Sequence, residues 1–176
     1  MRFTAAALPG LIIVDLSVMS DDRGYFARTF CAEEFAAAGL PTVFPQCNTS
    51  FNLARGTLRG LHWQADPYPE GKLVRCTRGM ILDVAVDLRP ESPTCRRWFG
   101  IELSAEDGRA LYIPPGFAHG FQTLADETEV FYQMSEAYRR DLSRGGRWDD
   151  PAFGIDWPIR NPILSPRDAA YPNYVA

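Results

Sequence analysis

The stretch GRALYIPPGFAH, residues 108–119, is an apolar run that holds two glycines, two prolines and one of the chain's two histidines. Five residues separate its first glycine from its first proline, and two separate its second glycine from His119. The other histidine, His62, ends a second glycine-bounded stretch, GTLRGLH, residues 56–62. A single histidine in an apolar segment is usually a core residue whose ring nitrogens are hydrogen-bonded. For either histidine alone, a core position is therefore the favoured interpretation.

Short β-branched or aromatic runs surround this stretch, and turn sequences divide them. Turn sequences such as RPESPT and AEDGR recur about every ten residues, a spacing typical of all-β proteins. In MILDVAVDL, residues 80–88, apolar residues dominate, as in a strand buried on a sheet face. The sequence therefore predicts strands over residues 11–18, 72–79, 80–88, 97–104, 109–114, 120–124 and 128–135.

A helix is expected in one segment, AEEFAAAGL, residues 32–40. Its alanines favour helix, its acidic residues lie in the first turn, and Gly39 is placed to end it. The tail from Arg144 is rich in proline and tryptophan and is predicted to form loops with one helical turn. We expect a single all-β domain over residues 1–176. It is a β-sandwich or jelly-roll barrel with a short N-terminal helix and an irregular, partly helical C-terminal segment.

The composition narrows the classes of function. The net charge of −4 gives no indication of non-specific nucleic-acid binding, although local arginines can still bind an anionic small molecule. Pro9, Gly10 and Asp15 interrupt the N-terminal apolar run, so neither a membrane span nor a signal peptide is expected. The four cysteines lack Cys-x-x-Cys spacing, and reduced thiols in a cytoplasmic protein are the favoured interpretation.

The two histidine segments resemble the two signature segments of the cupin barrels. The resemblance implies that each histidine lies on a strand facing the barrel interior, and it favours one pocket that both share. Most cupins bind a metal through three histidines and a glutamate. This chain has two histidines and carries Gln64 at the second position after His62. A tight zinc or iron site is therefore not expected, and we predict a cupin without a metal or another cofactor.

Longer segments resemble one cupin family closely. DRGYFARTF, RGLHWQ, KLVRCTRG, IPPGFAHGFQTL, EVFYQMSEAY and SPRD are similar to segments of the dTDP-4-dehydrorhamnose 3,5-epimerase family, and the match runs from about Gly10 to Asp168. The resemblance implies a cofactor-independent isomerase that inverts C3 and C5 of a dTDP-linked 4-keto-6-deoxysugar. The product then belongs to rhamnose synthesis or to the deoxysugar of a secondary metabolite.

The resemblance also assigns the catalytic roles. His62 resembles the base and Asp168 the carboxylate that orients it, while Tyr132 resembles the acid on the opposite face of the sugar. Lys72, the only lysine of the chain, resembles a group beside the keto oxygen, where a compact charge suits a developing oxyanion. Without the resemblance, Tyr132 is interpreted as a core aromatic residue and Asp168 as a turn residue.

Further positions are implied at the substrate, and two depart from the family pattern. Arg28 and Ser143 stand where the family commonly has acidic residues at the nucleotide end of the site, so another nucleotide such as CDP stays open. The implied contacts are Arg23 and Arg59 at the pyrophosphate, Phe26 against the base, Gln46 and Asn48 at the nucleotide, His119 near the sugar, and Tyr138 and Arg167 beside the ligand.

Several alternatives stay open at this point. A nucleotide-sugar 3,4-ketoisomerase shares the barrel and the keto sugar, and a 3-only or 5-only epimerase inverts one carbon. A non-catalytic sugar- or nucleotide-binding cupin needs no base–acid pair, which the joint presence of His62, Lys72 and Tyr132 argues against. A dioxygenase-like metal cupin conflicts with the histidine count. The family resemblance also implies a homodimer that exchanges strand segments, and residues 11–18 are the candidate exchanged strand.

Overall fold

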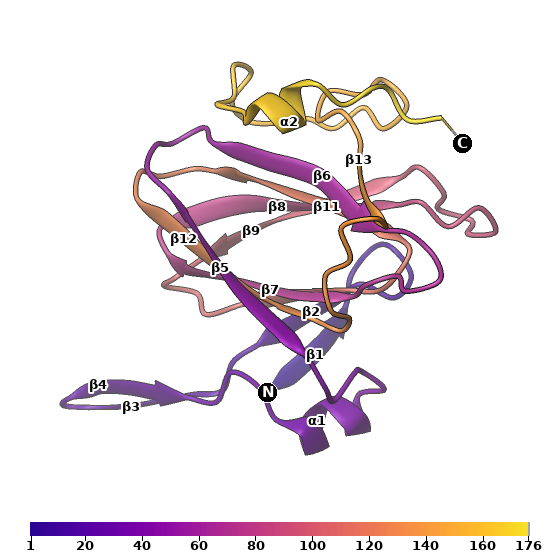
Figure 1. Cartoon of the computed structure of the whole chain (residues 1–176). Coiled ribbons are helices and arrows are strands. Elements are labelled where there is room, and N and C mark those ends of the chain that lie inside the picture. Colours follow the sequence, from indigo (N-terminus) through magenta and orange to yellow (C-terminus); the bar gives the residue numbers. More distant parts are fainter. Residues whose placement is uncertain (176) are drawn as a thin grey trace.

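Two antiparallel sheets face each other and enclose the interior of a barrel (Figure 1). The computed structural model describes residues 1–175. One sheet has six strands in the order β1-β2-β10-β7-β12-β5, and the other has five in the order β13-β6-β11-β8-β9. This arrangement is the predicted all-β jelly-roll barrel. The strand bounds are β1 Arg2–Ala5, β2 Ile12–Asp15, β5 Gln46–Asn52, β6 Leu58–Gln64, β7 Lys72–Arg78, β8 Met80–Asp87, β9 Trp98–Ser104, β10 Ala110–Ile113, β11 Phe117–Thr123, β12 Thr128–Met134 and β13 Ser143–Gly145.

Strands that the apolar runs predicted form the barrel core. β8 and β11 pair along most of their length inside the five-stranded sheet, and every residue of β11 is buried. From the other sheet, Val74 of β7 and Leu111 of β10 are fully buried in one apolar cluster with Ile81 and Leu103. Burial of such a side chain stabilises the fold by about 1.5–3 kcal/mol. This cluster therefore holds the two sheets together.

Two strands near the interior were not among those that the apolar periodicity predicts. In β5, the partly buried Gln46, Asn48 and Ser50 alternate with exposed residues, so one face of the strand points inward. The inward residues are polar, and a strand with a polar inner face shows no hydrophobic alternation. β6, which carries His62, was expected as a strand only from the cupin resemblance. The polar inner face of β5 indicates that this side of the interior is a site rather than core.

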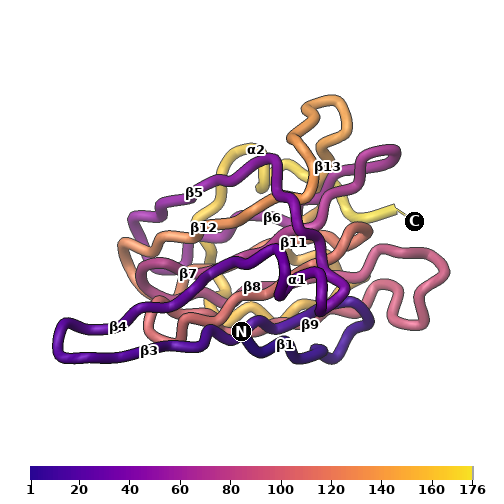
Figure 2. Tube along the Cα trace, turned by 90° about the horizontal axis from the view of Figure 1, so that it is seen from below, coloured from indigo at the N-terminus to yellow at the C-terminus, as the bar shows by residue number. Residues whose placement is uncertain are grey.

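A two-stranded hairpin extends away from the barrel. β3 Val18–Asp21 and β4 Gly24–Ala27 pair with each other and belong to neither large sheet. They project beyond the body of the molecule in two perpendicular views (Figure 1 and Figure 2). Met19 and Phe26 on this hairpin are 62% and 65% exposed. The predicted strand over residues 11–18 is thus β2 of the sheet followed by the beginning of this hairpin, residues 18–27, here named the arm.

The helical segments are short, and one of them lies at the C-terminal end. α1 Ala32–Ala37 ends before the predicted boundary, and Gly39 adopts a φ of 71°, a left-handed conformation common just after helices. The C-terminal segment lies over the five-stranded sheet (Figure 1), where Trp157 joins an apolar cluster with Leu58. This segment contains α2 Pro166–Ala169, the predicted helical turn. No helix within residues 1–175 is long and apolar enough to cross a membrane.

Candidate active site

The two histidines are direct neighbours across a strand pair. His62 of β6 lies opposite His119 of β11 in the antiparallel register, so both rings project from the same face of the sheet. The two strands approach closely beside them. Gly60 has a φ of 126°, and a Cβ atom there would lie 2.6 Å from the Cα of Gly120. A larger residue at position 60 would push the strands apart, so these glycines help to set how the two rings lie in the barrel.

His62 is paired with Asp168, as the family resemblance implied. The Nε2 atom of His62 lies 2.6 Å from Oδ1 of Asp168, and the backbone N–H of Asp168 donates to Ser165, the N-cap of α2. Burial would raise the pKa of Asp168, but hydrogen bonds from His62, Ser165 and the backbone of Gly60 lower it below its usual range. The carboxylate is therefore charged at neutral pH and can stabilise a protonated His62.

His119 has a carboxylate partner that is absent from the predicted site residues. Its Nε2 atom lies 2.7 Å from Oδ1 of Asp83 on β8, and Asp83 is fully buried. The second oxygen of this carboxylate, Oδ2, makes no hydrogen bond with any of residues 1–175. The sequence does carry a signal, because an acidic residue in the middle of MILDVAVDL needs a polar partner when buried. The barrel thus contains two separate histidine–aspartate pairs.

Lys72 is buried in an ion pair with a second residue that was not predicted. Its Nζ atom lies 3.0 Å from Oε1 of Glu70 and 3.5 Å from the carbonyl oxygen of His62. The side chains of Lys72 and Glu70 are 8% and 7% exposed. Glu70 lies in the turn sequence DPYPEG, where an acidic residue is ordinary and carries no signal. Only the folded chain brings its carboxylate to the lysine.

Tyr132 lies on β12, in the sheet that faces the sheet of His62. In the register of β12 and β7, Tyr132 is opposite Val74 and Met134 is opposite Lys72, so Tyr132 and Lys72 project from the same face. Burial raises the pKa of Tyr132; Arg59 opposes this shift and the Glu70 carboxylate adds to it. The phenol therefore keeps its proton at neutral pH, as a proton donor must.

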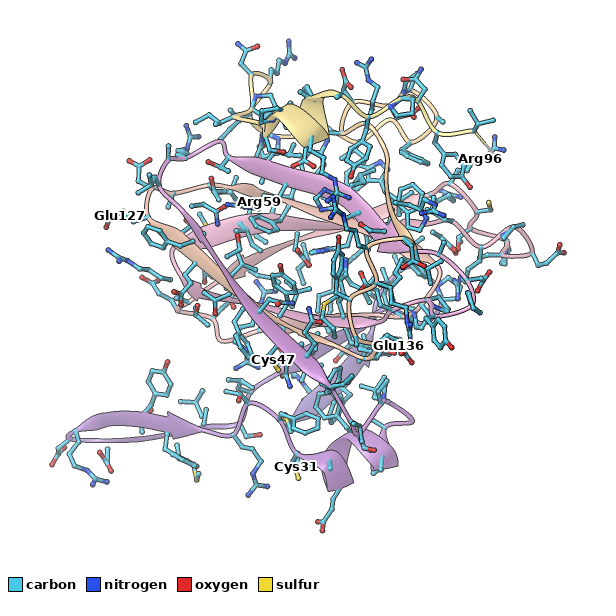
Figure 3. All side chains as sticks on the ribbon, viewed as in Figure 1. Cys31, Cys47, Arg59, Arg96, Glu127 and Glu136 are labelled. Atoms are coloured by element: carbon cyan, nitrogen blue, oxygen red, sulfur yellow. The ribbon has the colours of Figure 1, made fainter. Side chains whose placement is uncertain are left out.

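A cavity opens where these side chains meet. Two adjoining pockets of about 330 and 340 Å³ share His62, Lys72 and Tyr132 in their walls. The wall of the second also includes Arg59, whose Nε donates to Asn52 of β5 at 2.7 Å; Figure 3 shows Arg59 near β5 and β6. Volumes of this size are typical of small-molecule sites. The predicted residues in these walls are Gln46, Asn48, Arg59, His62, Lys72, His119, Tyr132, Tyr138, Arg167 and Asp168.

The end of the cavity that the resemblance implies for the nucleotide is lined with mutually bonded polar groups. Gln46 accepts a hydrogen bond from the backbone N–H of Tyr138 at 2.9 Å and donates to Asn48 at 3.3 Å. Arg167 donates to the hydroxyl of Ser143 at 3.0 Å. Ser143 therefore lies at the predicted end of the site. There its hydroxyl accepts a hydrogen bond from Arg167 and leaves the charge of this guanidinium in place, whereas an acidic residue would neutralise it.

Three predicted positions do not reach the cavity of their own chain. Arg23 and Phe26 lie on the arm, where Arg23 forms an ion pair with Asp21, and neither lines the pockets. Arg28 lies beside α1 and forms an ion pair with Glu34 at 3.1 Å. Its predicted place at the nucleotide end is thus not found within one chain. The arm, which carries Arg23 and Phe26, projects away from the barrel (Figure 2).

The side chains of the cavity are suited to proton transfer. Within residues 1–175, no three histidine, cysteine or acidic side chains are grouped as possible metal ligands. The ring of His62 uses one nitrogen for Asp168 and makes no other side-chain hydrogen bond among these residues. A base with a charged partner, a protonated phenol and a buried ammonium around one cavity can remove and return protons beside a carbonyl group.

Comparison with known proteins decides the family. The model of the dTDP-4-dehydrorhamnose 3,5-epimerase family matches residues 5–175. The chain belongs to this family. The dTDP-4-dehydrorhamnose 3,5-epimerase of Methanothermobacter thermautotrophicus is 48% identical, over 95% of this chain and 91% of that protein. The Shigella flexneri epimerase is 44% identical, over 96% and 93%.

A solved epimerase structure confirms the fold. The crystal structure of the dTDP-4-dehydrorhamnose 3,5-epimerase from Bacillus anthracis, with TDP and PPi bound, matches with a TM-score of 0.96 and 38% identity. The match covers 98% of this chain and 99% of that chain. The predicted cupin-type jelly roll and the predicted epimerase family are confirmed, and the chain is an isomerase. None of these relatives favours the ketoisomerase, the metal cupin or the non-catalytic cupin.

Proposed function

We propose that this chain inverts C3 and C5 of dTDP-4-dehydro-6-deoxyglucose and forms dTDP-4-dehydro-L-rhamnose. One observation carries the proposal. His62, paired with a charged Asp168, lines one wall of the cavity, and the protonated Tyr132 lines the wall from the opposite sheet. The names of the relatives support the substrate. We place the reaction in the cytoplasm, which the four unpaired cysteines support.

Proton removal by His62 is the first step. The C4 keto group acidifies the C–H bonds at C3 and C5, because the charge left by deprotonation moves onto the keto oxygen as an enolate. His62 takes the proton, and the carboxylate of Asp168 stabilises the imidazolium that forms. Lys72 presents its ammonium in the same cavity and stabilises the enolate oxygen. No electron leaves the sugar, so the step is redox-neutral.

Proton return by Tyr132 completes the inversion. The phenol gives its proton to the enolate carbon from the face opposite His62, and the new C–H bond has the inverted configuration. His62 then loses its proton to solvent, and Tyr132 regains one. His119, held by the buried Asp83, lies beside His62 and contacts the sugar near its keto group. The same sequence at the second carbon gives the doubly inverted product.

The nucleotide is assigned to the polar end of the cavity. Gln46 and Asn48 offer amide groups that both donate and accept hydrogen bonds, as the edge of a pyrimidine base requires. Tyr138 and Arg167 lie beside them, and Arg59 lies in the neighbouring pocket with a guanidinium suited to the pyrophosphate. Thymidine is the favoured base because the relatives act on dTDP sugars by name.

Proton NMR of dTDP-4-dehydro-6-deoxyglucose incubated with the protein in D₂O tests this function. We expect deuterium to enter at both C3 and C5, because each inversion passes through an enolate that takes its new proton from an exchangeable group. Deuterium at one carbon alone would show a single-site epimerase. The nucleotide assignment would be contradicted if the dTDP-linked sugar took up no deuterium while the corresponding CDP-linked sugar did.

We further propose a homodimer in which the arm of one chain completes the cavity of its partner. Four large apolar side chains of the arm are exposed, Val18 and Tyr25 on one face of the hairpin and Met19 and Phe26 on the other. Exposed apolar side chains on both faces are typical of a segment that enters an interface. The arm also carries Arg23, a predicted pyrophosphate contact that lies outside the cavity of its own chain. β2 pairs with β1 and β10 of its own chain. The arm is therefore a better exchanged segment than residues 11–18.

Co-expressed variants test whether the cavity is shared. We expect Arg23→Ala to raise KM about tenfold with little change in kcat, because a charged contact to the pyrophosphate is lost. A heterodimer of an Arg23→Ala chain with a His62→Ala chain then has one cavity with both residues intact. Its KM should equal that of the unsubstituted protein. A heterodimer with the raised KM of Arg23→Ala, or a monomer in light scattering, would contradict the proposal.

A further inference from the structure

Glu70 is a nearly buried carboxylate in the wall of the cavity, and the mechanism above gives it no role. Its Oε1 atom lies 3.0 Å from Nζ of Lys72, and it has no other ion-pair or hydrogen-bond partner among the side chains of residues 1–175. The next residue, Gly71, forms two hydrogen bonds with Ser135, the residue that follows β12. Its N–H donates to the hydroxyl of Ser135 at 2.7 Å, and its carbonyl accepts from the N–H of Ser135 at 2.9 Å. The backbone beside the carboxylate is therefore held in place.

Glu70 limits the directions in which the lysine ammonium can point. A lysine side chain has four rotatable bonds and three N–H donors. The Nζ atom of Lys72 lies 3.0 Å from Oε1 of Glu70 in an ion pair, and it donates to the carbonyl oxygen of His62 at 3.5 Å. No other ion-pair or hydrogen-bond partner of this atom is found among residues 1–175. These two contacts hold the ammonium from the protein side, and it can still donate to an oxygen in the cavity that Lys72 lines.

The charge of Glu70 also decides whether an ammonium is tolerated at this depth. A nearly buried cation without a counter-ion is costly, and breaking a buried ion pair leaves that cost in place. A second effect reaches Tyr132, because the Glu70 carboxylate adds to the raised pKa of this phenol. The same carboxylate would repel an enolate if Lys72 did not lie beside it. Its benefit to the reaction therefore depends on the lysine.

We infer that Glu70 is a positioning residue that aims the Lys72 ammonium at the C4 oxygen of the substrate. The inference rests on the proposed function and deepens it. Glu70 does not touch the reacting atoms, and its effect passes through Lys72. Removal of its charge loosens the ammonium in the ground state and weakens its contact with the enolate in the transition state. The loss then falls on kcat rather than on KM.

A double-mutant cycle tests whether Glu70 acts through Lys72. We expect Glu70→Gln, which keeps the side-chain shape, to lower kcat about tenfold with KM within about twofold. In a Lys72→Met background, the same substitution should leave kcat unchanged or raise it, because the unpaired carboxylate repels the enolate. Glu106→Gln, at an exposed acidic residue outside the cavity, is the matched control and should leave kcat unchanged in both backgrounds.

The single lysine allows a readout that does not depend on turnover. Protein labelled with ¹⁵N-lysine gives one side-chain signal, which belongs to Lys72. We expect its relaxation to indicate a rigid ammonium in the unsubstituted protein and in Glu106→Gln, and a mobile one in Glu70→Gln. If the unsubstituted protein catalyses deuterium uptake from D₂O into neither nucleotide-linked keto sugar, the proposed function fails. The ¹⁵N signal of Lys72 still tests the ion pair with Glu70 in that case.

Three results would overturn the inference. The first is an equal loss of kcat from Glu70→Gln with and without Lys72, which would mean that Glu70 acts independently of the lysine. The second is a raised KM with unchanged kcat, which would place Glu70 in direct contact with the substrate. The third is a Lys72 signal with the same relaxation in Glu70→Gln as in the unsubstituted protein.

Discussion

Replacing His62 by alanine is expected to lower deuterium incorporation at both C3 and C5 by about 10³-fold or more. Both exchanges should fall together, because one imidazole with one carboxylate partner serves both carbons in the proposed mechanism. The measurement is the initial rate of loss of the C3 and C5 proton signals in D₂O, at a substrate concentration that saturates the enzyme. A loss at one carbon only would contradict a single shared base.

A change of this size must be separated from a change of fold. His62 is partly exposed on β6, and the apolar clusters of the core do not include it, so its removal should leave the barrel intact. Thermal unfolding of His62→Ala checks this expectation. His62→Asn retains a polar group that can reach Asp168 but cannot act as a base at neutral pH. It should be as inactive as His62→Ala. Substantial exchange by His62→Asn would show that another group removes the protons.

Replacing Tyr132 by phenylalanine is expected to separate proton exchange from inversion. The substitution removes one hydroxyl from a side chain that lines both pockets. His62 can still remove a proton and return a deuteron to the same face, so exchange with retained configuration continues. Inversion needs a donor on the opposite face, and its rate should fall about 10²–10⁴-fold. Proton NMR distinguishes the two results, because retained and inverted sugars have different signals.

Tyr112 provides a matched control for this experiment. Tyr112 lies in the same sheet as the partly buried Tyr132, it is itself buried, and burial raises its pKa as well. It lies on β10 in an apolar cluster with Phe35 and lines neither pocket. Tyr112→Phe should leave the rates of exchange and inversion unchanged. Inversion by Tyr132→Phe at the rate of Tyr112→Phe would show that another group delivers the second proton.

Local patterns were sufficient for much of the barrel. The apolar run of MILDVAVDL indicated a buried strand, and it is β8 in the interior of the five-stranded sheet. Gly39 indicated the end of α1, and its left-handed conformation follows the last helical turn. Both signals depend on neighbouring residues only. β5 escaped prediction for the same reason, because its inner residues face a polar cavity that is formed by other strands.

The residues of the site also fall into two groups, those that the sequence indicated and those that only the folded chain reveals. The sequence by itself determined the family and the histidine segments, because short motifs such as RGLH and AHGF carry their glycines and histidines at fixed spacings. The family resemblance also implied that Asp168 meets His62, across 106 residues. No local pattern indicated that Asp83 meets His119, across 36 residues.

Only the tertiary structure decided which further side chains pair with one another and which predicted residues line the cavity. In the sequence Glu70 is an ordinary turn residue, and only the folded chain brings it into an ion pair with Lys72. Arg23 and Phe26 lie outside the cavity because the arm extends away from the barrel. The physical reason is that an ion pair or a cavity wall depends on distances through space. Those distances are fixed by sheet register and burial, to which residues far apart in the chain contribute together.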